Sequence, residues 1–209
     1  MKIIVLSEGV DDNKTCSYTL LNKVPDVTFK TDSSLLKGGK PFFVPEWGAP
    51  CMARPYVVVH LSRLGKSIYR RFAGRYYDGL SLGVTIDAAG LKRKLQERGL
   101  ASDLAGSMDG GAMLGKTFDF GNGALQIDGQ AVQDVRFSVA VDGKECGSVG
   151  LEGLDVIFAA QIEWLSRWMT LRQGDLLFAV PLCNSFPLEI GQRICGFLNA
   201  DVVLDFNIK

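Results

Sequence analysis

Histidine is almost absent from this 209-residue sequence, because His60 is the one residue of its kind. A Ser-His-Asp triad would have to use His60 as its base, and no G-x-S-x-G sequence supplies the serine. Long apolar runs are missing too, since no stretch approaches the ~18 residues that a membrane helix needs. Basic and acidic residues both number 23, so no overall field favours nucleic acid or an anionic membrane. We therefore expect no nucleic-acid partner and no membrane partner.

Cysteine pairs of the C-x-x-C kind are absent as well. The five cysteines are scattered along the chain, at Cys16, Cys51, Cys146, Cys183 and Cys195. Their odd number and wide spacing argue against a zinc site. The opening sequence MKIIVLSEGVDD has an apolar run too short for the core of a signal peptide. We expect free thiols in a protein of the reducing cytoplasm.

Much of the sequence has the composition of β-strands. Residues 56–61, YVVVHL, combine β-branched and aromatic side chains and give the strongest strand prediction. Two Asp-Gly pairs lie between apolar residues and predict β-hairpins at 125–132 and 135–147. Further strands are expected within 1–6, 79–88, 172–182 and 202–209, with short pieces broken by glycine and proline within 27–50.

Three segments favour helices. In residues 88–100, Leu91 and Leu95 lie four residues apart among charged residues, and Gly99 is a natural stop. Residues 155–171 have helical spacing of apolar side chains, and we expect their two tryptophans to lie in the core. Residues 66–80 are compatible with a third helix that ends at Gly74 or Gly79. Together with the length, this predicts one mixed α+β domain over residues 1–209, mostly β.

Several sequence pieces, taken in order, resemble the fumarylacetoacetate hydrolase family. They begin with KTDSSLLKGGKPFFVP at 30–45 and cover nearly the whole chain with few gaps. The others are RLGKSI at 63–68, RYYDGLSLGV at 75–84, GLASDLAGSMDGGAMLGK at 99–116, VDGK at 141–144, LSRWMTLRQGDLLF at 165–178 and PLEIGQRICGFL at 187–198. The resemblance implies a β-roll with a few helices that assembles as a homodimer.

The family's chemistry, as the resemblance implies it, depends on a divalent cation. Members bind Mg²⁺ or Mn²⁺ through three carboxylates and act on 2-oxo or enol acids by C–C hydrolysis, isomerisation or decarboxylation. The cation chelates the substrate oxygens and stabilises the developing enolate. Hard cations prefer oxygen ligands, which is why the site is built from carboxylates.

At the matching positions of this sequence the three carboxylates are replaced. The family's E-x-E pair falls on Arg54, Pro55 and Tyr56, and its aspartate falls on Thr85. The family's A-K-x-F-D-G segment becomes residues 105–110, which lose the lysine at Gly106 but keep Asp109 and Gly110. Turn glycines and core apolar residues remain. The replaced residues are those that would handle metal and substrate.

A rebuilt site would need other carboxylates near Thr85. Asp87 lies two residues further along the same expected strand and so shares its face. Arg54, however, places a permanent positive charge where a ligand should be, and at an effective dielectric of about 20 a unit charge and a dication about 4 Å apart repel by roughly 8 kcal/mol. Our hypothesis is that Arg54 replaces the charge of the metal and pairs with Asp87 or Asp109. The remodelled pocket is expected to comprise Arg54, Tyr56, Thr85, Asp87 and Asp109, with no metal.

Three functions remain open. The chain is either a non-catalytic relative that serves as a scaffold or as the partner of an active paralogue, or a binder of a small organic acid through Arg54. The alternative is an active Mg²⁺- or Mn²⁺-dependent hydrolase or isomerase with a rebuilt site. No catalytic residue is assigned. Tyr56 is expected to fill the pocket rather than act as a base, and His60 to be structural, because it lies about 13 Å along the strand from Tyr56.

Overall fold

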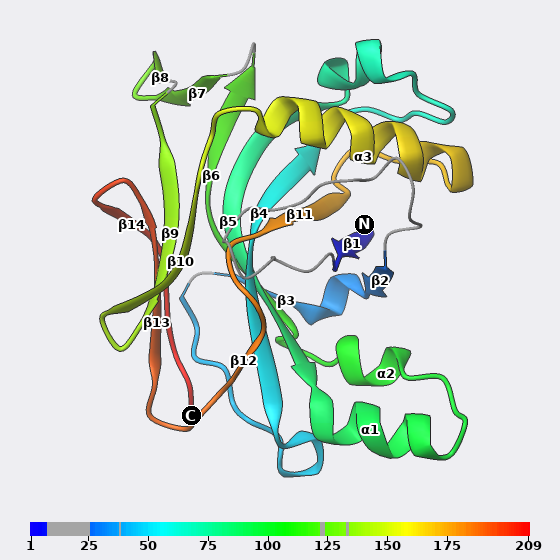
Figure 1. Ribbon diagram of the computed structural model, residues 1–209, viewed down its shortest axis with the longest axis vertical. Coiled ribbons are helices and arrows are strands. Elements are labelled where there is room, and N and C mark those ends of the chain that lie inside the picture. The colour runs from blue at the N-terminus through cyan, green and yellow to red at the C-terminus, as the bar shows by residue number, and fades with distance from the viewer. Residues whose placement is uncertain (8–25, 38, 122–123, 133) are drawn as a thin grey trace.

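The computed structural model describes residues 1–7, 26–37, 39–121, 124–132 and 134–209. The described residues form two sheets, with a long helix across one end and two shorter helices at the other (Figure 1). The larger sheet has the strand order β2-β1-β11-β4-β5-β6-β7-β8, with β12 paired to β4 and β3 paired to β6. The smaller sheet has the order β10-β9-β13-β14.

The elements follow one another along the chain with these bounds. The strands are β1 (Ile3–Leu6), β2 (Val27–Lys30), β3 (Leu35–Lys37), β4 (Cys51–Leu61), β5 (Tyr77–Ala88), β6 (Ala112–Gly121), β7 (Ala124–Ile127), β8 (Gln130–Val132), β9 (Arg136–Val141), β10 (Lys144–Gly150), β11 (Leu176–Pro181), β12 (Phe186–Pro187), β13 (Arg193–Leu198) and β14 (Asp201–Asn207). The α-helices are α1 (Ala89–Glu97), α2 (Asp103–Gly106) and α3 (Leu154–Trp168). Short 3₁₀ turns are η1 (Asp32–Ser34), η2 (Glu46–Gly48) and η3 (Arg70–Arg75).

Most strand and helix predictions are confirmed. Both Asp-Gly pairs form hairpin turns with positive φ at each residue, at Asp128-Gly129 between β7 and β8 and at Asp142-Gly143 between β9 and β10. Helix α1 occupies the predicted segment and is followed by Gly99 with φ of +67°. No helix of the described residues is long and apolar enough to cross a membrane.

Two local predictions were wrong. Residues 66–80 do not form an α-helix: the short turn η3 covers part of the segment and the rest belongs to β5. The aromatic and glycine residues there are weak helix formers, and Tyr77 is taken into the sheet, where it stacks on Phe120 at 5.7 Å between ring centroids. Trp168 is not in the core, because 68% of it is exposed at the end of α3, although it still touches Trp164.

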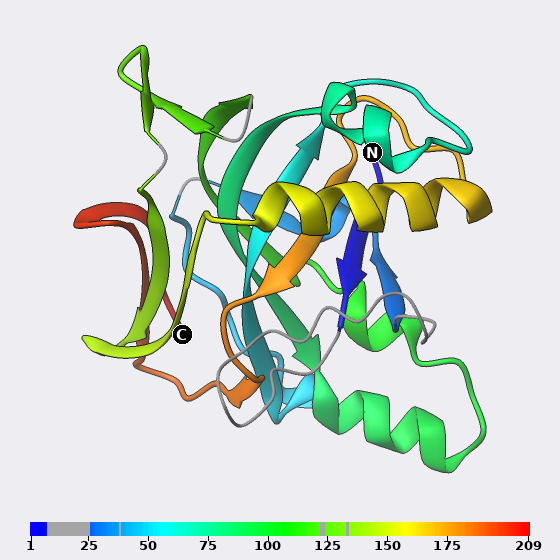
Figure 2. The ribbon, with the colours of Figure 1, turned by 45° about the horizontal axis from the view of Figure 1, so that its top comes forward.

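The core lies on one face of β4 and β5. Alternate residues of these strands point into a large apolar cluster that also contains β13, β14 and the inner face of α3. Figure 2 shows α3 lying across the larger sheet, and its buried side chains, including Phe158, Ile162 and Leu165, cover this face. On the opposite face of β4 and β5, the described residues form a smaller apolar cluster around Tyr56, Val58 and Phe178. Polar side chains of the central strands are therefore gathered on that second face.

Glycines permit the two sheets to approach closely. A Cβ at Gly115 in β6 would lie 2.5 Å from the backbone oxygen of Val203 in β14. A Cβ at Gly196 in β13 would lie 2.2 Å from the Cδ2 atom of Leu82 in β5. Interiors are packed as densely as organic crystals, so this contact leaves no room for an added methyl group.

We predict that Gly115→Ala lowers the free energy of unfolding by about 1–3 kcal/mol, because its methyl group would overlap backbone that cannot rotate away. Chemical denaturation followed by circular dichroism measures the change. Gly121→Ala in the same strand is the control, since a Cβ there meets no atom within 4 Å. Equal stability of the two variants would contradict the described approach of the sheets.

Candidate functional site

The candidate residues on β4 and β5 lie together because of the register between these strands. Arg54 is the direct cross-strand partner of Thr85, Met52 is the partner of Asp87, and Tyr56 is the partner of Gly83. Residues of one parity share one face, so Arg54, Tyr56, Thr85 and Asp87 all belong to the face opposite the main core. The prediction that Asp87 shares the face of Thr85 is confirmed.

Tyr56 is a packed, pocket-filling side chain on the second face of the sheet, as expected. Only 1% of it is exposed, and its ring meets the ring of Phe178 edge-on at 5.8 Å between centroids. Gly83 makes room for this packing, because a Cβ there would lie 2.8 Å from a ring carbon of Phe178. Burial raises the pKa of Tyr56, although the charge of Arg54 opposes the rise. A neutral, buried phenol of this kind is a poor general base near neutral pH.

Arg54 is anchored from two sides. Its Nε donates a hydrogen bond to the carbonyl oxygen of Cys183 at 3.2 Å. Its guanidinium carbon lies 5.7 Å from the centre of the Tyr56 ring. The backbone oxygen of Arg54 accepts a bond from Thr85 Oγ1 at 3.4 Å. The guanidinium is thus positioned by fixed groups of the protein before any ligand arrives.

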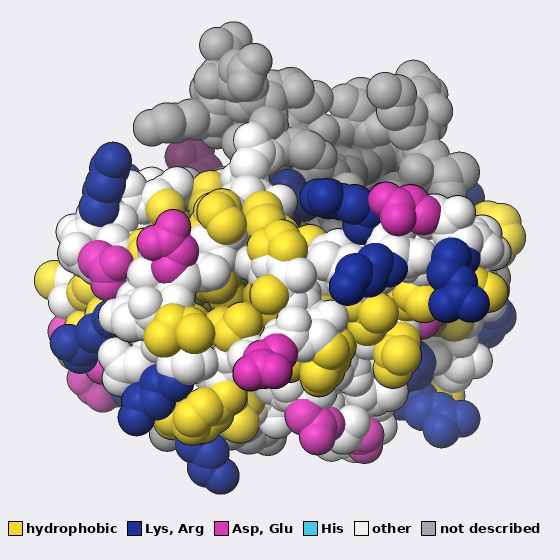
Figure 3. All heavy atoms as spheres, turned by 90° about the horizontal axis from the view of Figure 1, so that it is seen from below, with side chains coloured by type: hydrophobic (Ala, Val, Ile, Leu, Met, Phe, Trp, Pro, Cys, Tyr) yellow, Lys and Arg dark blue, Asp and Glu magenta, His cyan; other side chains and the backbone are white. Residues whose placement is uncertain are grey.

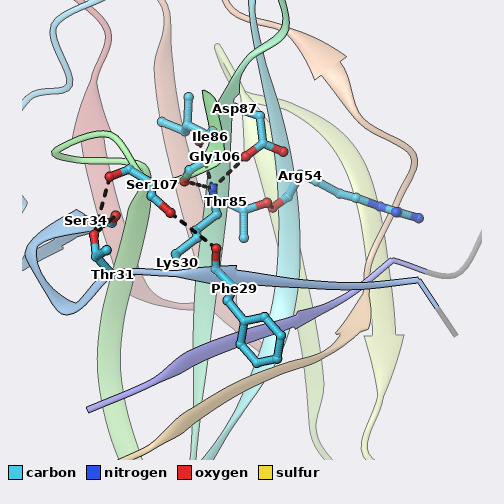
Figure 4. A network of polar contacts seen from close by, with 10 residues as sticks. All are labelled: Phe29, Lys30, Thr31, Ser34, Arg54, Thr85, Ile86, Asp87, Gly106 and Ser107. Atoms are coloured by element: carbon cyan, nitrogen blue, oxygen red, sulfur yellow. Dashed lines mark hydrogen bonds and ion pairs between the residues drawn. The ribbon is translucent and has the colours of Figure 1, made fainter. Parts of the chain in front are cut away.

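The ion pair expected between Arg54 and Asp87 is replaced by a different one. Asp87 Oδ1 lies 2.6 Å from the Nζ atom of Lys30, the last residue of β2. Figure 4 shows the side chain of Arg54 leaving the strand in a direction away from Asp87, while Lys30 points at it. The hypothesis that Arg54 pairs with Asp87 is therefore wrong, and Lys30 is the cation that does so.

The ammonium group of Lys30 is held by three acceptors. Besides Asp87, it donates to the backbone oxygen of Gly106 at 2.6 Å and to that of Ile86 at 3.1 Å (Figure 4). Only 2% of the Lys30 side chain is exposed, whereas 41% of the Asp87 side chain is. Burial lowers the pKa of Lys30, and the nearby carboxylate of Asp87 opposes this shift. With three acceptors, one of them charged, the buried ammonium satisfies every donor that it carries.

Lys30 lies close to the place of the lysine that the family resemblance expects at position 106. A Cβ built on Gly106 would lie 3.7 Å from Lys30 Nζ and 3.2 Å from Asp87 Oδ1. The ammonium group therefore reaches this region from β2 rather than from the end of α2. The sequence offered only an indirect signal for the role of Lys30. This residue begins the KTDSS segment, and Gly106 stands where the resemblance expects a lysine.

Asp109 and His60 lie apart from this network. Asp109 is exposed in the turn between α2 and β6. His60 is at the other end of β4, where its Nε2 lies 2.8 Å from the hydroxyl oxygen of the buried Ser81. It borders a separate cavity of about 610 Å³ on the same face of the sheet, beside Leu114 and Lys116. Cys16 lies outside the described residues.

The described residues do not fit a carboxylate-bound metal. The three positions that the resemblance assigns to metal ligands carry a guanidinium, a buried phenol and a hydroxyl. Asp87 is already neutralised by Lys30, and the cavity bordered by these two residues holds only about 50 Å³. Within the described ranges, no group of three or more histidine, cysteine, aspartate or glutamate side chains is placed to hold an ion. Instead, this face carries two anchored cationic side chains, Lys30 and Arg54.

Comparison with known proteins establishes the fold. No protein-family model matches the chain, and no curated protein is significantly similar in sequence. Solved structures are similar over nearly the whole chain. A fumarylpyruvate hydrolase from Pseudomonas aeruginosa, solved in complex with Mn²⁺ and pyruvate, has a TM-score of 0.77 at 16% identity, covering 99% of this chain and 88% of its own.

Two further solved structures have a similar fold. The 5-carboxymethyl-2-hydroxymuconate delta-isomerase from Mycobacterium smegmatis has a TM-score of 0.78 at 18% identity, over 99% of this chain and 78% of its own. A protein from Yersinia pestis CO92 that is assigned to the fumarylacetoacetate hydrolase family has a TM-score of 0.77 at 16% identity, over 100% of this chain and 92% of its own. The prediction of the fumarylacetoacetate hydrolase fold is confirmed.

We predict that Lys30→Met lowers the free energy of unfolding by about 2–4 kcal/mol. The substitution keeps the side-chain length but leaves the oxygens of Ile86 and Gly106 without their donor and Asp87 without its partner. Urea denaturation measures the loss. The matched control is Lys94→Met on the exposed side of α1, expected to change stability by less than about 0.5 kcal/mol. If both variants unfold alike, the buried ammonium network is not present in solution.

Proposed function

We propose that this chain is a fumarylacetoacetate hydrolase-like protein that has lost the metal-dependent chemistry of the family and binds a small organic acid at Arg54. The observation that carries the proposal is a guanidinium fixed in place at a position where the resemblance expects a metal-binding carboxylate. A site with this charge attracts anions and repels divalent cations.

The anchoring of Arg54 favours binding of a carboxylate. A guanidinium forms paired, charge-assisted hydrogen bonds with a carboxylate. Because Cys183 and Tyr56 already position the side chain, little side-chain entropy remains to be lost when a ligand binds. Thr85 is its cross-strand neighbour and contributes a hydroxyl to the same face. These features support a site for a small carboxylate, in the class of the 2-oxo and enol acids that the family handles.

Lys30 supports the proposed loss of metal-dependent chemistry. In the metal-dependent members a divalent cation supplies positive charge at this face. Here the ammonium of Lys30 supplies it from within the chain and is paired with Asp87. An ammonium on a buried lysine with three protein acceptors has no open coordination position for a substrate oxygen. The proposal is accordingly a binding function without hydrolysis or isomerisation.

The assembly and location follow from the same resemblance. We propose a homodimer or a complex with an active paralogue, in the cytoplasm. On the face seen from below, acidic and basic side chains are interspersed with apolar ones (Figure 3). This mixture fits a protein surface that contacts other proteins better than one that binds nucleic acid. For a homodimer, light scattering of the purified chain should give twice the mass of one chain. For a complex with a paralogue, it should give the mass of one chain, which about doubles when the paralogue is added.

We predict that sodium pyruvate or another small 2-oxo acid raises the melting temperature by several degrees, because a ligand that binds only the folded state stabilises it. Differential scanning fluorimetry against sodium chloride of equal ionic strength measures the shift. Arg54→Gln should abolish it.

The control for this experiment is Arg63→Gln, which removes an exposed arginine from the turn after β4 and should leave the shift intact. The melting temperature of Arg54→Gln without acid shows whether that variant is folded. A panel of 2-oxo and dicarboxylic acids that leaves the wild-type melting temperature unchanged would overturn the organic-acid site.

A further inference from the structure

An irregularity in β10 gives Cys146 an unusual position. In the β9–β10 ladder, Glu145 pairs with Ala140 and Gly147 pairs with Val139, so Cys146 is the extra residue of a β-bulge. A bulge redirects the side chain of its extra residue. The thiol of Cys146 donates to the carbonyl oxygen of Val139 at 3.2 Å and is only partly buried.

The residue after the bulge allows another segment to approach. A Cβ at Gly147 would lie 2.3 Å from the backbone oxygen of Leu182 and 2.8 Å from the Cβ of Cys183. Any side chain at position 147 would therefore collide with the segment that leaves β11. The glycine permits this close approach, and it brings the smaller sheet against the connection between β11 and β12.

The two thiols meet at this crossing. The side chains of Cys146 and Cys183 interact at this point, although the residues are 37 positions apart in the sequence. The interaction between the two thiols lowers the pKa of Cys146 and raises the pKa of Cys183, whose burial acts in the same direction. Cys146 is thus the better nucleophile of the pair, and Cys183 holds the proton. Both side chains are partly exposed, so a small oxidant can reach them.

We propose that Cys146 and Cys183 form a reversible disulfide, a redox modification site that ties the smaller sheet to the larger one. The proposal rests on a bulge at Cys146 and on the close approach of Cys183 to the neighbouring Gly147, which bring two partly exposed cysteines together. The two remaining described cysteines lack such a neighbour: Cys51 is buried and bonded to the oxygen of Gly48, and Cys195 lies beside Asp205.

The reaction uses a small-molecule disulfide such as oxidised glutathione. The Cys146 thiolate attacks one sulfur of glutathione disulfide, and one glutathione thiolate leaves and takes up a proton. The Cys183 thiol then loses its proton and attacks the Cys146 sulfur, which expels the second glutathione as a thiol. Two protein thiols are oxidised to one disulfide, and one glutathione disulfide is reduced to two glutathione molecules.

The site adjoins Arg54 but does not depend on the anion-binding proposal. The carbonyl of Cys183 accepts the bond from Arg54 Nε, and the charge of Arg54 favours the Cys183 thiolate that the second step needs. Either proposal can fail without the other, because disulfide formation is read from peptide masses and anion binding from a ligand-dependent melting shift.

The test treats the reduced, full-length protein with excess oxidised glutathione, blocks free thiols with N-ethylmaleimide and maps the cysteines by peptide mass spectrometry. We expect a linked peptide pair containing Cys146 and Cys183 that dithiothreitol separates. Closing this loop should also raise the melting temperature by about 5–10 °C over the reduced protein.

Cys183→Ser should abolish the linked pair and the melting shift and leave Cys146 as a glutathione adduct, whereas Cys195→Ser should alter neither. The peptide map of the wild-type protein shows by itself whether the disulfide forms, so the test holds even if a variant fails to fold. Glutathione adducts at Cys146 and Cys183 without the link, no reaction at either residue, or a link from either residue to Cys16 would each overturn the proposal.

Discussion

The register between β4 and β5 is the constraint on which the rest of the structure depends. Side chains alternate between the two faces of a strand, so a slip of one residue in either strand would move all of its side chains to the opposite face of the sheet. In the observed register, Val57, Val59 and Leu82 lie in the main core. Arg54 and Thr85 then necessarily lie opposite each other on the second face. The apolar core thereby fixes the position of the polar site.

Positive charge on that second face is satisfied within the chain. An isolated buried ammonium is costly, and Lys30 is tolerated because Asp87 and two backbone oxygens surround it. Arg54 is held by the carbonyl of Cys183 and the ring of Tyr56. The Pseudomonas aeruginosa hydrolase that was solved with Mn²⁺ and pyruvate has a similar fold. In this chain Arg54 and Lys30 place two positive charges on the second face, which is the basis of the proposed loss of catalysis.

The fold was largely predictable because its signals are local. β-branched runs, Asp-Gly turns and the spacing of Leu91 and Leu95 each act over a few residues. The parity of Asp87 and Thr85 followed from strand geometry alone.

The Lys30–Asp87 pair was not predictable in this way, because β2 and β5 lie far apart in sequence and their relative placement depends on the whole fold. The same is true of Cys146 and Cys183, whose contact requires both a bulge and a neighbouring glycine. Trp168 was misplaced because helical periodicity identifies the apolar side of a helix but not where its neighbours stop.

The proposed replacement of a metal by fixed cations is tested most directly by calorimetric titration of Mn²⁺ into the purified, metal-free chain. With Arg54 and Lys30 on the face in question, the account predicts no saturable binding below millimolar concentration. Saturable, stoichiometric binding in the micromolar range, accompanied by hydrolysis or isomerisation of a 2-oxo or enol acid, would contradict it.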